Sequence, residues 1–204
     1  MDRRTLLVGF VSLLLIGAVA AGVFLFSRPA AFRGTMYGEP YPQAPEIELT
    51  RDNGARFRLS EMRGNVVLLF FGYTSCPDVC PTTMAELKQA LETLDKKDAE
   101  QVRVLFVTVD PERDTPERVQ EYVDHFNPNF IGLSGMESEL VKVWNDYGVF
   151  REIVRGNSAA GYLINHTARI TVIDRDGNLR LSYAFDTSVD SIVHDLKLLL
   201  KEKS

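Results

Sequence analysis

The sequence contains few cysteines and histidines, with 2 and 3 among 204 residues. Two cysteines exclude a disulfide scaffold and a four-thiolate zinc site. Glycine (14) and proline (9) are at ordinary levels, which excludes collagen-like and low-complexity chains. A chain of this length buries roughly 70% of its unfolded surface in a single core, so folding does not require the cysteines. Their presence therefore calls for a chemical explanation.

Charge is absent from the 23 residues Thr5–Ser27, which are mostly apolar. As a helix they extend over about 34 Å, enough to cross a hydrocarbon core of roughly 30 Å. Ala18–Ala20 resembles a signal-peptide cleavage site, but the apolar run continues to Phe26 and favours an uncleaved anchor. We therefore expect residues 1–27 to form one transmembrane helix, and the short N-terminal tail favours export of the body.

Prolines are concentrated in residues 28–45, which hold four of the nine. This segment is predicted to be an extended linker between the membrane and a domain at 46–204. Residues 1–40 carry a net charge of +2, so the remaining residues account for −7 in a chain of net charge −5. An acidic body argues against a nucleic-acid partner and is compatible with a metal ion or a cationic protein.

Hydrophobic periodicity predicts an alternation of strands and helices in the body. Continuous apolar runs indicate buried strands, and apolar stripes three and four residues apart indicate helices. The predicted strands are 66–71, 102–109, 130–133, 169–173 and 179–185, and the predicted helices lie near 84–94, from Asp114 as N-cap, near 140–147 and from Thr187 or Ser188 onward. Gly148–Asn165 is predicted to be a loop. This order gives an α/β fold of the thioredoxin-like type, a mixed sheet with helices on both faces.

Both cysteines lie in one loop, where the strand at 66–71 leads into the next helix. Helix N–H groups and the positive end of the helix dipole lower the pKa of a thiol there and favour the thiolate. Three residues separate Cys76 from Cys80, a spacing that permits either a disulfide or joint binding of one metal ion. Two thiolates prefer Cu(I), and an added imidazole also suits Cu(II) or zinc.

A third ligand is expected among the three histidines. His125 and His194 fall at a helix end and on a helix surface, where structural or solvated roles are common. His166 immediately precedes the strand at 168–173, and in a thioredoxin-like sheet that loop packs beside the active-site helix. His166 is therefore the candidate, against the alternative of a loop histidine that binds nothing.

Three stretches of the body resemble the Sco/SenC family of membrane-tethered copper-binding proteins. These stretches read FFGYTSCPDVCPTTMAEL, FVTVDPERDTPERVQEYVDHF and GYLINHTARITVIDRDGNL. The resemblance implies a thioredoxin-like fold and copper bound by Cys76, Cys80 and His166. It also implies a role in building the binuclear copper centre of cytochrome c oxidase, with the body in the periplasm or an equivalent compartment and the anchor in the inner membrane.

Two aspartates fall on the same family motifs. Asp78 lies between the cysteines, where it tunes the site electrostatically or bonds local backbone N–H groups. Asp110 ends a strand, where it orients a ligand or shapes a turn. Met84 fits the apolar stripe of its helix and is predicted to belong to the core. The family often has tyrosines before its histidine, whereas this chain has Tyr162 four residues ahead.

Three functional classes are compatible with these residues. A copper metallochaperone would pass Cu(I) or Cu(II) by ligand exchange to the copper-centre subunit of the oxidase, and its further partners would be another periplasmic copper chaperone or a thiol reductant. A thiol-disulfide oxidoreductase would use the redox-active pair Cys76 and Cys80 to reduce that subunit's copper-ligating cysteines. A thiol peroxidase would need a polar cradle, for which Thr74 and Arg169 are candidates.

Overall fold

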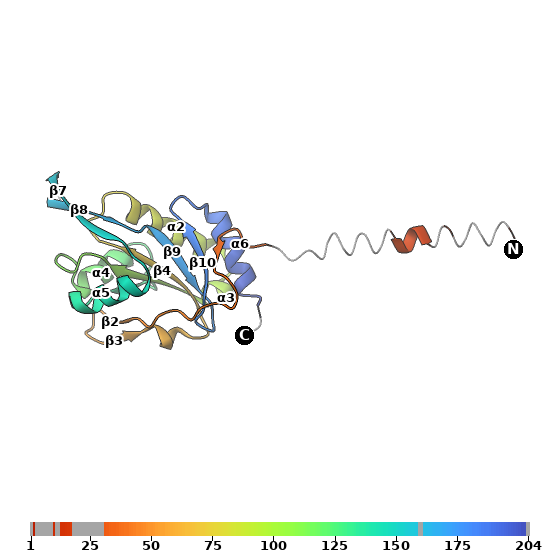
Figure 1. Cartoon of the computed structure of the whole chain (residues 1–204), viewed down its shortest axis with the longest axis horizontal. Coiled ribbons are helices and arrows are strands. Elements are labelled where there is room, and N and C mark those ends of the chain that lie inside the picture. Colours follow the sequence, from red (N-terminus) through yellow and green to blue (C-terminus); the bar gives the residue numbers. More distant parts are fainter. Residues whose placement is uncertain (1, 3–9, 11–12, 18–30, 159–160, 203–204) are drawn as a thin grey trace. The chain divides into compact units, whose positions relative to one another are not determined.

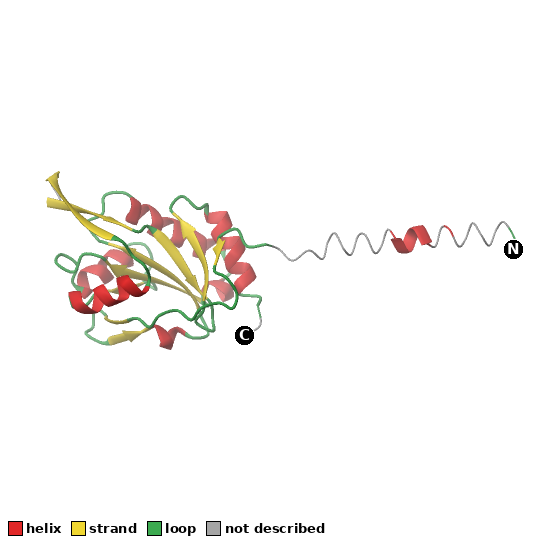
Figure 2. Ribbon diagram, viewed as in Figure 1, coloured by secondary structure: helices red, strands yellow, loops and turns green. Residues whose placement is uncertain are grey.

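A six-stranded mixed sheet lies at the centre of the domain (Figures 1 and 2). The structure is a computed structural model that describes residues 2, 10, 13–17, 31–158 and 161–202. The strand order is β1-β10-β9-β4-β5-β6, in which β4, β5 and β6 are parallel and the other neighbours are antiparallel. The strands are β1 (Thr35–Met36), β4 (Val66–Gly72), β5 (Val102–Thr108), β6 (Ile131–Leu133), β9 (Arg169–Ile173) and β10 (Leu179–Ala184).

Helices cover both faces of this sheet, which confirms the thioredoxin-like fold. Alternate residues of a strand point to opposite faces, and aromatic contacts show which helix covers which face. Phe106 contacts Tyr122 of α4, whereas Phe71 contacts Tyr147 at the end of α5, on the other face. The helices are α2 (Val79–Thr93), α3 (Lys96–Ala99), α4 (Pro116–Asp124), α5 (Glu137–Asp146) and α6 (Val189–Leu199), and α2 packs against α6.

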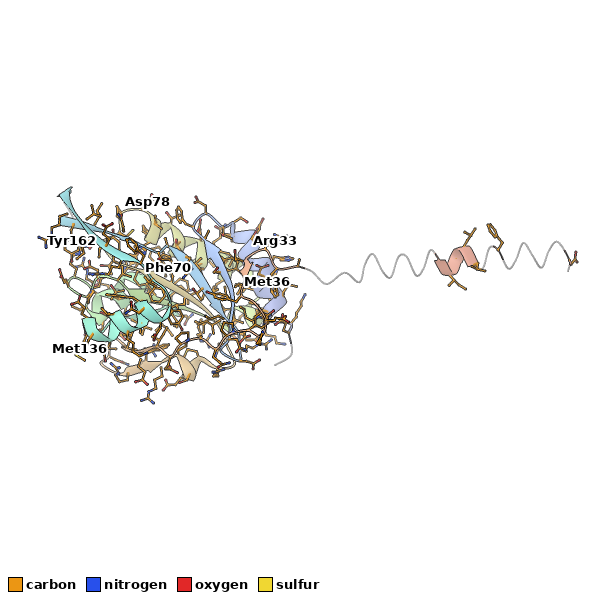
Figure 3. The ribbon with its side chains drawn as sticks, in the orientation of Figure 1. Arg33, Met36, Phe70, Asp78, Met136 and Tyr162 are labelled. Atoms are coloured by element: carbon orange, nitrogen blue, oxygen red, sulfur yellow. The ribbon has the colours of Figure 1, made fainter. Side chains whose placement is uncertain are left out.

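The central strand β4 is buried along its whole length, as its continuous apolar sequence predicts. Phe70 contacts Phe106 of β5 within the sheet and lies in the interior of the domain (Figure 3). A smaller sheet of β2 (Glu48–Thr50) and β3 (Arg56–Arg58) is followed by the 3-10 helix η1 (Leu59–Met62). The buried strand ends at the cysteine loop, so the core itself determines where that loop begins.

The start of α4 differs from the sequence prediction. The N-cap is Thr115, whose hydroxyl accepts a hydrogen bond from the backbone N–H of Arg118 at 3.3 Å. Asp114 does not cap this helix, because its carboxylate turns inward and bonds to Thr74 and Thr108. The final helix begins as predicted, with Ser188 as its N-cap.

Residues 148–165, predicted to be a loop, form most of a β-hairpin. Its strands β7 (Arg151–Ser158) and β8 (Gly161–His166) pair with each other as a separate two-stranded sheet that projects from the domain (Figure 1). The register shifts between Arg155 and Ser158, and the residues mix charged and polar types. No clear apolar alternation marks the strands, which explains why periodicity missed them.

The described part of the predicted linker lies on the domain. Strand β1 pairs with Leu181 and Ser182 of β10, and the backbone N–H groups of Arg33 and Gly34 donate to the buried carboxylate of Asp195 at 2.8–3.0 Å. Residues 1–31 and 32–204 form two separate units. Residues 32–45 therefore belong to the domain, which differs from the extended spacer expected from their prolines.

Most of the predicted membrane span, Thr5–Ser27, lies outside the described residues. Within the part of the chain that the structure describes, no helix combines the length and the apolar character needed to cross a bilayer. Residues 13–17 are helical. The transmembrane anchor therefore stays a prediction from the sequence.

Candidate metal centre

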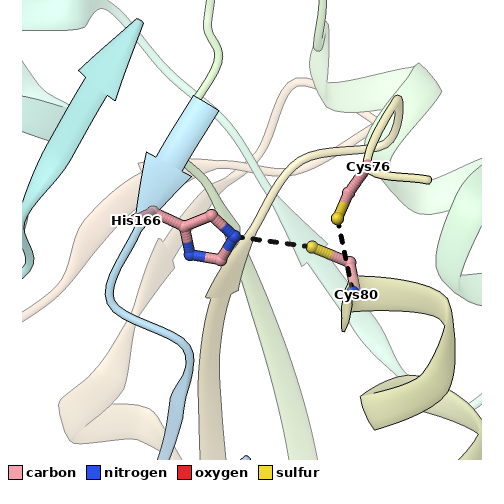
Figure 4. A group of neighbouring side chains, drawn as sticks. All are labelled: Cys76, Cys80 and His166. Carbon is pink, nitrogen blue, oxygen red and sulfur yellow. Dashed lines mark hydrogen bonds between the residues drawn. The ribbon is translucent and has the colours of Figure 1, made fainter. Parts of the chain in front are cut away.

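The two cysteines lie where β4 leads into α2 (Figure 4). A turn after β4, in which the N–H of Cys76 donates to the carbonyl of Tyr73, places the Cys76 sulfur at the start of the helix. Cys80 lies in the first turn of α2, and its backbone N–H donates to Cys76 Sγ at 3.4 Å. The free N–H groups and the positive dipole of the helix therefore face the sulfur of Cys76, as the sequence predicts.

His166 reaches the cysteines from the other end of the domain's sequence. It is the last residue of β8 and is separated from β9 by two residues, as predicted. Its Nε2 lies 3.7 Å from Cys80 Sγ although 86 residues separate them (Figure 4). Nδ1 lies 3.1 Å from the carbonyl oxygen of Thr167, and a proton on Nδ1 leaves the Nε2 lone pair directed at the cysteines. The rings of Phe70 and Tyr73 contact the imidazole edge-on.

The spacing of the three side chains fits a single metal ion. The ligand atoms of Cys76, Cys80 and His166 all lie within 4.8 Å of one another. Metal–sulfur and metal–nitrogen bonds of about 2.3 and 2.0 Å, spread at trigonal angles, would place sulfur and nitrogen about 3.7 Å apart. The distance from Cys80 Sγ to His166 Nε2 has this value. Two sulfurs with one imidazole nitrogen form a donor set that suits copper.

The two thiols hold their protons very differently. A hydrogen bond from Cys80 stabilises the Cys76 thiolate, helped by His166 and by the backbone amides of Asp78 and Cys80, and together they outweigh burial and lower the pKa of Cys76 to about 3. The same hydrogen bond, followed by burial and the nearby negative charge, raises the pKa of Cys80 far above its usual value. At neutral pH the metal-free pair therefore contains one thiolate and one thiol.

An open pocket of about 270 Å3 leads to this centre. Cys76 is half-buried at the pocket, and Cys80 is fully buried behind it. The pocket is lined by apolar groups together with the candidate ligands Cys76 and His166. The lining includes Tyr73, Cys76, Pro77, Val79, Leu163 and His166. An incoming group therefore reaches the Cys76 thiolate first.

The two predicted aspartates occupy very different environments. Asp78 is exposed at the margin of the domain (Figure 3), and among the described residues its side chain caps no backbone N–H of α2. Its backbone amide stabilises the Cys76 thiolate. Asp110 is fully buried and accepts hydrogen bonds from Tyr162 at 2.7 Å and from Arg113. Asp110 therefore contacts the hairpin that bears His166 through its hydrogen bonds with Tyr162 and Arg113.

Asp114 is a site residue that the sequence interpretation missed. Its buried carboxylate accepts from the hydroxyl and backbone N–H of Thr74 at 2.6 and 3.0 Å and from the Thr108 hydroxyl at 2.7 Å. Desolvation outweighs these hydrogen bonds and raises the pKa of Asp114. Thr74 lies two residues before Cys76, so Asp114 fixes the cysteine loop. The sequence signal for it is the second aspartate of DPERD, whose position before a helix is equally typical of an N-cap.

The remaining candidates lie outside the metal centre. Met84 is fully buried in α2, in agreement with its prediction as a core residue. His125 lies at the end of α4, where its ring contacts the carbonyl of Glu121, and His194 lies on α6 beside Asp195. The proposed peroxide cradle does not form, because the Thr74 hydroxyl donates to Asp114 and the Arg169 guanidinium donates to the carbonyl of Tyr147.

The fold and the site define a thioredoxin-like domain with a two-cysteine, one-histidine candidate metal centre at the entrance of its first long helix. The SCO1/SenC family model matches residues 36–201. The chain therefore belongs to the SCO1/SenC family.

Relatives match almost the whole chain. An SCO2-like protein of Rickettsia felis is 34% identical over 202 residues, which cover 97% of this chain and 98% of the relative. The solution structure of apo Sco1 from Thermus thermophilus is 42% identical, covers 83% of this chain and 97% of that chain, and has a TM-score of 0.74. The structure of Bradyrhizobium japonicum ScoI with copper bound is 37% identical, covers 77% and 99%, and has a TM-score of 0.69.

Gly72 at the end of β4 makes room for the buried cysteine. A Cβ atom at this position would lie 2.8 Å from the Phe106 ring and 2.9 Å from Cys80 Sγ. We expect Gly72→Ala to lower the free energy of unfolding by about 1–3 kcal/mol because the core is overpacked. Urea unfolding measures this change. Gly38→Ala, which places its Cβ in open space, is the control, and equal stability of the two variants would contradict the prediction.

Proposed function

We propose that the protein is a copper metallochaperone that binds one copper ion through Cys76, Cys80 and His166. The observation that carries this proposal is the meeting of two sulfurs and one imidazole nitrogen within 4.8 Å, from segments 86 residues apart. Membership in the SCO1/SenC family and the copper bound to the Bradyrhizobium japonicum relative support the choice of metal.

The donor set suits both oxidation states of copper as cargo. Thiolates favour Cu(I), and the imidazole nitrogen extends the range to Cu(II). Cys80 is closed off from solvent, whereas Cys76 faces the open pocket. A thiolate of the receiving protein would therefore enter beside Cys76, and ligands would exchange one at a time, so that copper need not pass through water.

The proposed recipient is the copper-centre subunit of cytochrome c oxidase. This part of the proposal follows from the family resemblance, which implies a role in building the binuclear copper centre. Another periplasmic copper chaperone or a thiol reductant would act before the transfer. The reductant would be needed because an oxidised Cys76–Cys80 pair lacks two of the three ligands.

A second candidate function is reduction of a disulfide in the same oxidase subunit. The observation that favours it is the accessible Cys76 thiolate beside a buried Cys80 thiol. Cys76 would attack one sulfur of the partner's disulfide and release the other as a thiolate. Cys80, after losing its proton, would attack the mixed disulfide, which leaves a Cys76–Cys80 disulfide and two partner thiols.

Copper titration of the reduced full-length chain tests the first proposal. We expect one copper ion per chain, and an affinity at least about 10-fold lower in His166→Ala and in Cys76→Ser because each loses a ligand. Competition with a chromophoric Cu(I) chelator gives the affinities, and His125→Ala is a matched control. Wild-type affinity in both ligand variants would disprove the three-ligand site. Absence of copper binding, with rapid reduction of a disulfide substrate, would favour the reductase.

Copper affinity should rise with pH because the metal-free pair retains one proton. With the pKa of Cys76 lowered to about 3 and that of Cys80 raised, binding at neutral pH must displace the Cys80 proton. We expect the association constant to increase about 10-fold per pH unit between pH 7 and 8.5. Isothermal titration in buffers of different ionisation enthalpy counts the proton released. A pH-independent affinity would contradict this assignment.

We also propose that Thr5–Ser27 anchors the domain in the inner membrane with the domain in the periplasm. The uncharged length of the segment supports this proposal. The full-length chain should stay with membranes after alkaline carbonate extraction, and a variant that begins at Phe32 should be released. The domain should be digested by protease added outside the inner membrane. Extraction of the full-length chain by carbonate would exclude the anchor.

A further inference from the structure

Arg113 links the strand that carries His166 to the core of the domain. Its guanidinium stacks over the ring of Tyr162 with 3.7 Å between the guanidinium carbon and the ring centroid. One terminal nitrogen donates to the carbonyl of Tyr162 at 3.0 Å, and Nε donates to the carboxylate of Asp110. One side chain thus contacts both the backbone and the ring of Tyr162 on β8.

The carboxylate that holds Arg113 is fixed in the core. Asp110 is fully buried, and its backbone N–H donates to the Thr108 hydroxyl at 2.9 Å. The same carboxylate accepts from the Tyr162 hydroxyl at 2.7 Å. Arg113, Asp110 and Tyr162 therefore form a closed group, which we call the arginine clamp.

Among the described residues, few other hydrogen bonds join the hairpin to the body, although Ile164 is buried in the core. Strand β8 pairs with β7 outside the central sheet. Beyond the clamp, the described contacts of the hairpin backbone include the N–H of Ile164, which donates to the Tyr73 hydroxyl at 3.3 Å. On β7, the Arg151 guanidinium donates to the carbonyl of Val109. His166 lies four residues after Tyr162 on β8, so its position depends on how this strand is held.

The cysteines depend on different contacts. Their loop is held by hydrogen bonds from Thr74 to Asp114 and by the start of α2. Arg113 approaches this side of the site through the Tyr73 ring, whose centroid lies 5.7 Å from the guanidinium carbon. Loss of the clamp should therefore move the histidine and leave the thiol pair in place.

We infer that Arg113 is a positioning residue that holds His166 within bonding distance of a metal bound by the two cysteines. The inference rests on the proposed copper site. The arginine clamp determines what fraction of the bound copper is coordinated by all three protein ligands. Without it, copper would be held by the two sulfurs, and His166 would be displaced with β8.

Copper binding to Arg113→Ala in the reduced full-length chain tests this inference. Residues that orient a metal ligand from outside the coordination shell typically change metal affinity by about 10- to 100-fold, and we expect a loss in this range. The electron paramagnetic resonance spectrum of the Cu(II)-loaded variant should lose the nitrogen coupling and match that of His166→Ala. Tyr162→Leu, which removes the stacking surface from the hairpin side, should change affinity and spectrum in the same direction.

Arg155→Ala is the matched control, because Arg155 is exposed on the same hairpin and pairs with Tyr162 across the ladder. It removes the same charge without touching Asp110, and we expect wild-type affinity within about 2-fold and an unchanged spectrum. Circular dichroism should be the same in all folded variants, since the clamp does not hold the cysteine loop.

A double variant separates this inference from the proposed site. Arg113→Ala should have no further effect on copper affinity when combined with His166→Ala, because the clamp acts through the histidine. Equal losses in both backgrounds, or a wild-type spectrum in both Arg113→Ala and Tyr162→Leu, would overturn the positioning role. If His166→Ala itself left affinity and spectrum unchanged, the proposed three-ligand site would fail instead.

Discussion

The backbone N–H of Cys80 points at the sulfur of Cys76 because α2 begins directly after the loop that leaves β4. This contact places a thiolate at the positive end of a helix and a second thiol behind it in the core. The pKa values of the two cysteines then diverge, because the proton that Cys80 keeps forms a hydrogen bond to the Cys76 thiolate. The electrostatics of the metal centre thus follow from the junction between one strand and one helix.

That junction is held in place by groups that do not touch the metal position. Gly72 leaves space for Cys80 Sγ, and Asp114 binds the loop through Thr74. Burying a carboxylate carries a desolvation cost, visible in the raised pKa of Asp114, and hydrogen bonds from two threonines offset part of it. The thiol side of the centre is therefore built into the core, where each component limits the movement of the next.

The sequence was sufficient for those parts of the fold in which local pattern and burial agree. The apolar run from Val66 predicted β4, and the position of His166 before the strand at 168–173, together with the family resemblance, predicted that it lies beside the cysteines. Asp114 and Arg113 could not be assigned in this way, because their partners Thr74 and Tyr162 lie 40 and 49 residues away. The β7–β8 hairpin was missed for a related reason, since its strands mix polar and charged residues and depend on tertiary contacts.

The cysteine side and the histidine side of the metal centre are attached to the domain in different ways. Cys76 and Cys80 are held by the helix and the core, whereas His166 comes from a hairpin outside the central sheet. A carrier must bind copper firmly enough to avoid losing it and must still yield it to a receiving thiolate. Removing one nitrogen ligand by moving a hairpin disturbs the core less than opening the strand–helix junction. In the proposed copper carrier, this asymmetry would favour release that begins with His166, while the two sulfurs would retain the metal until an incoming ligand binds.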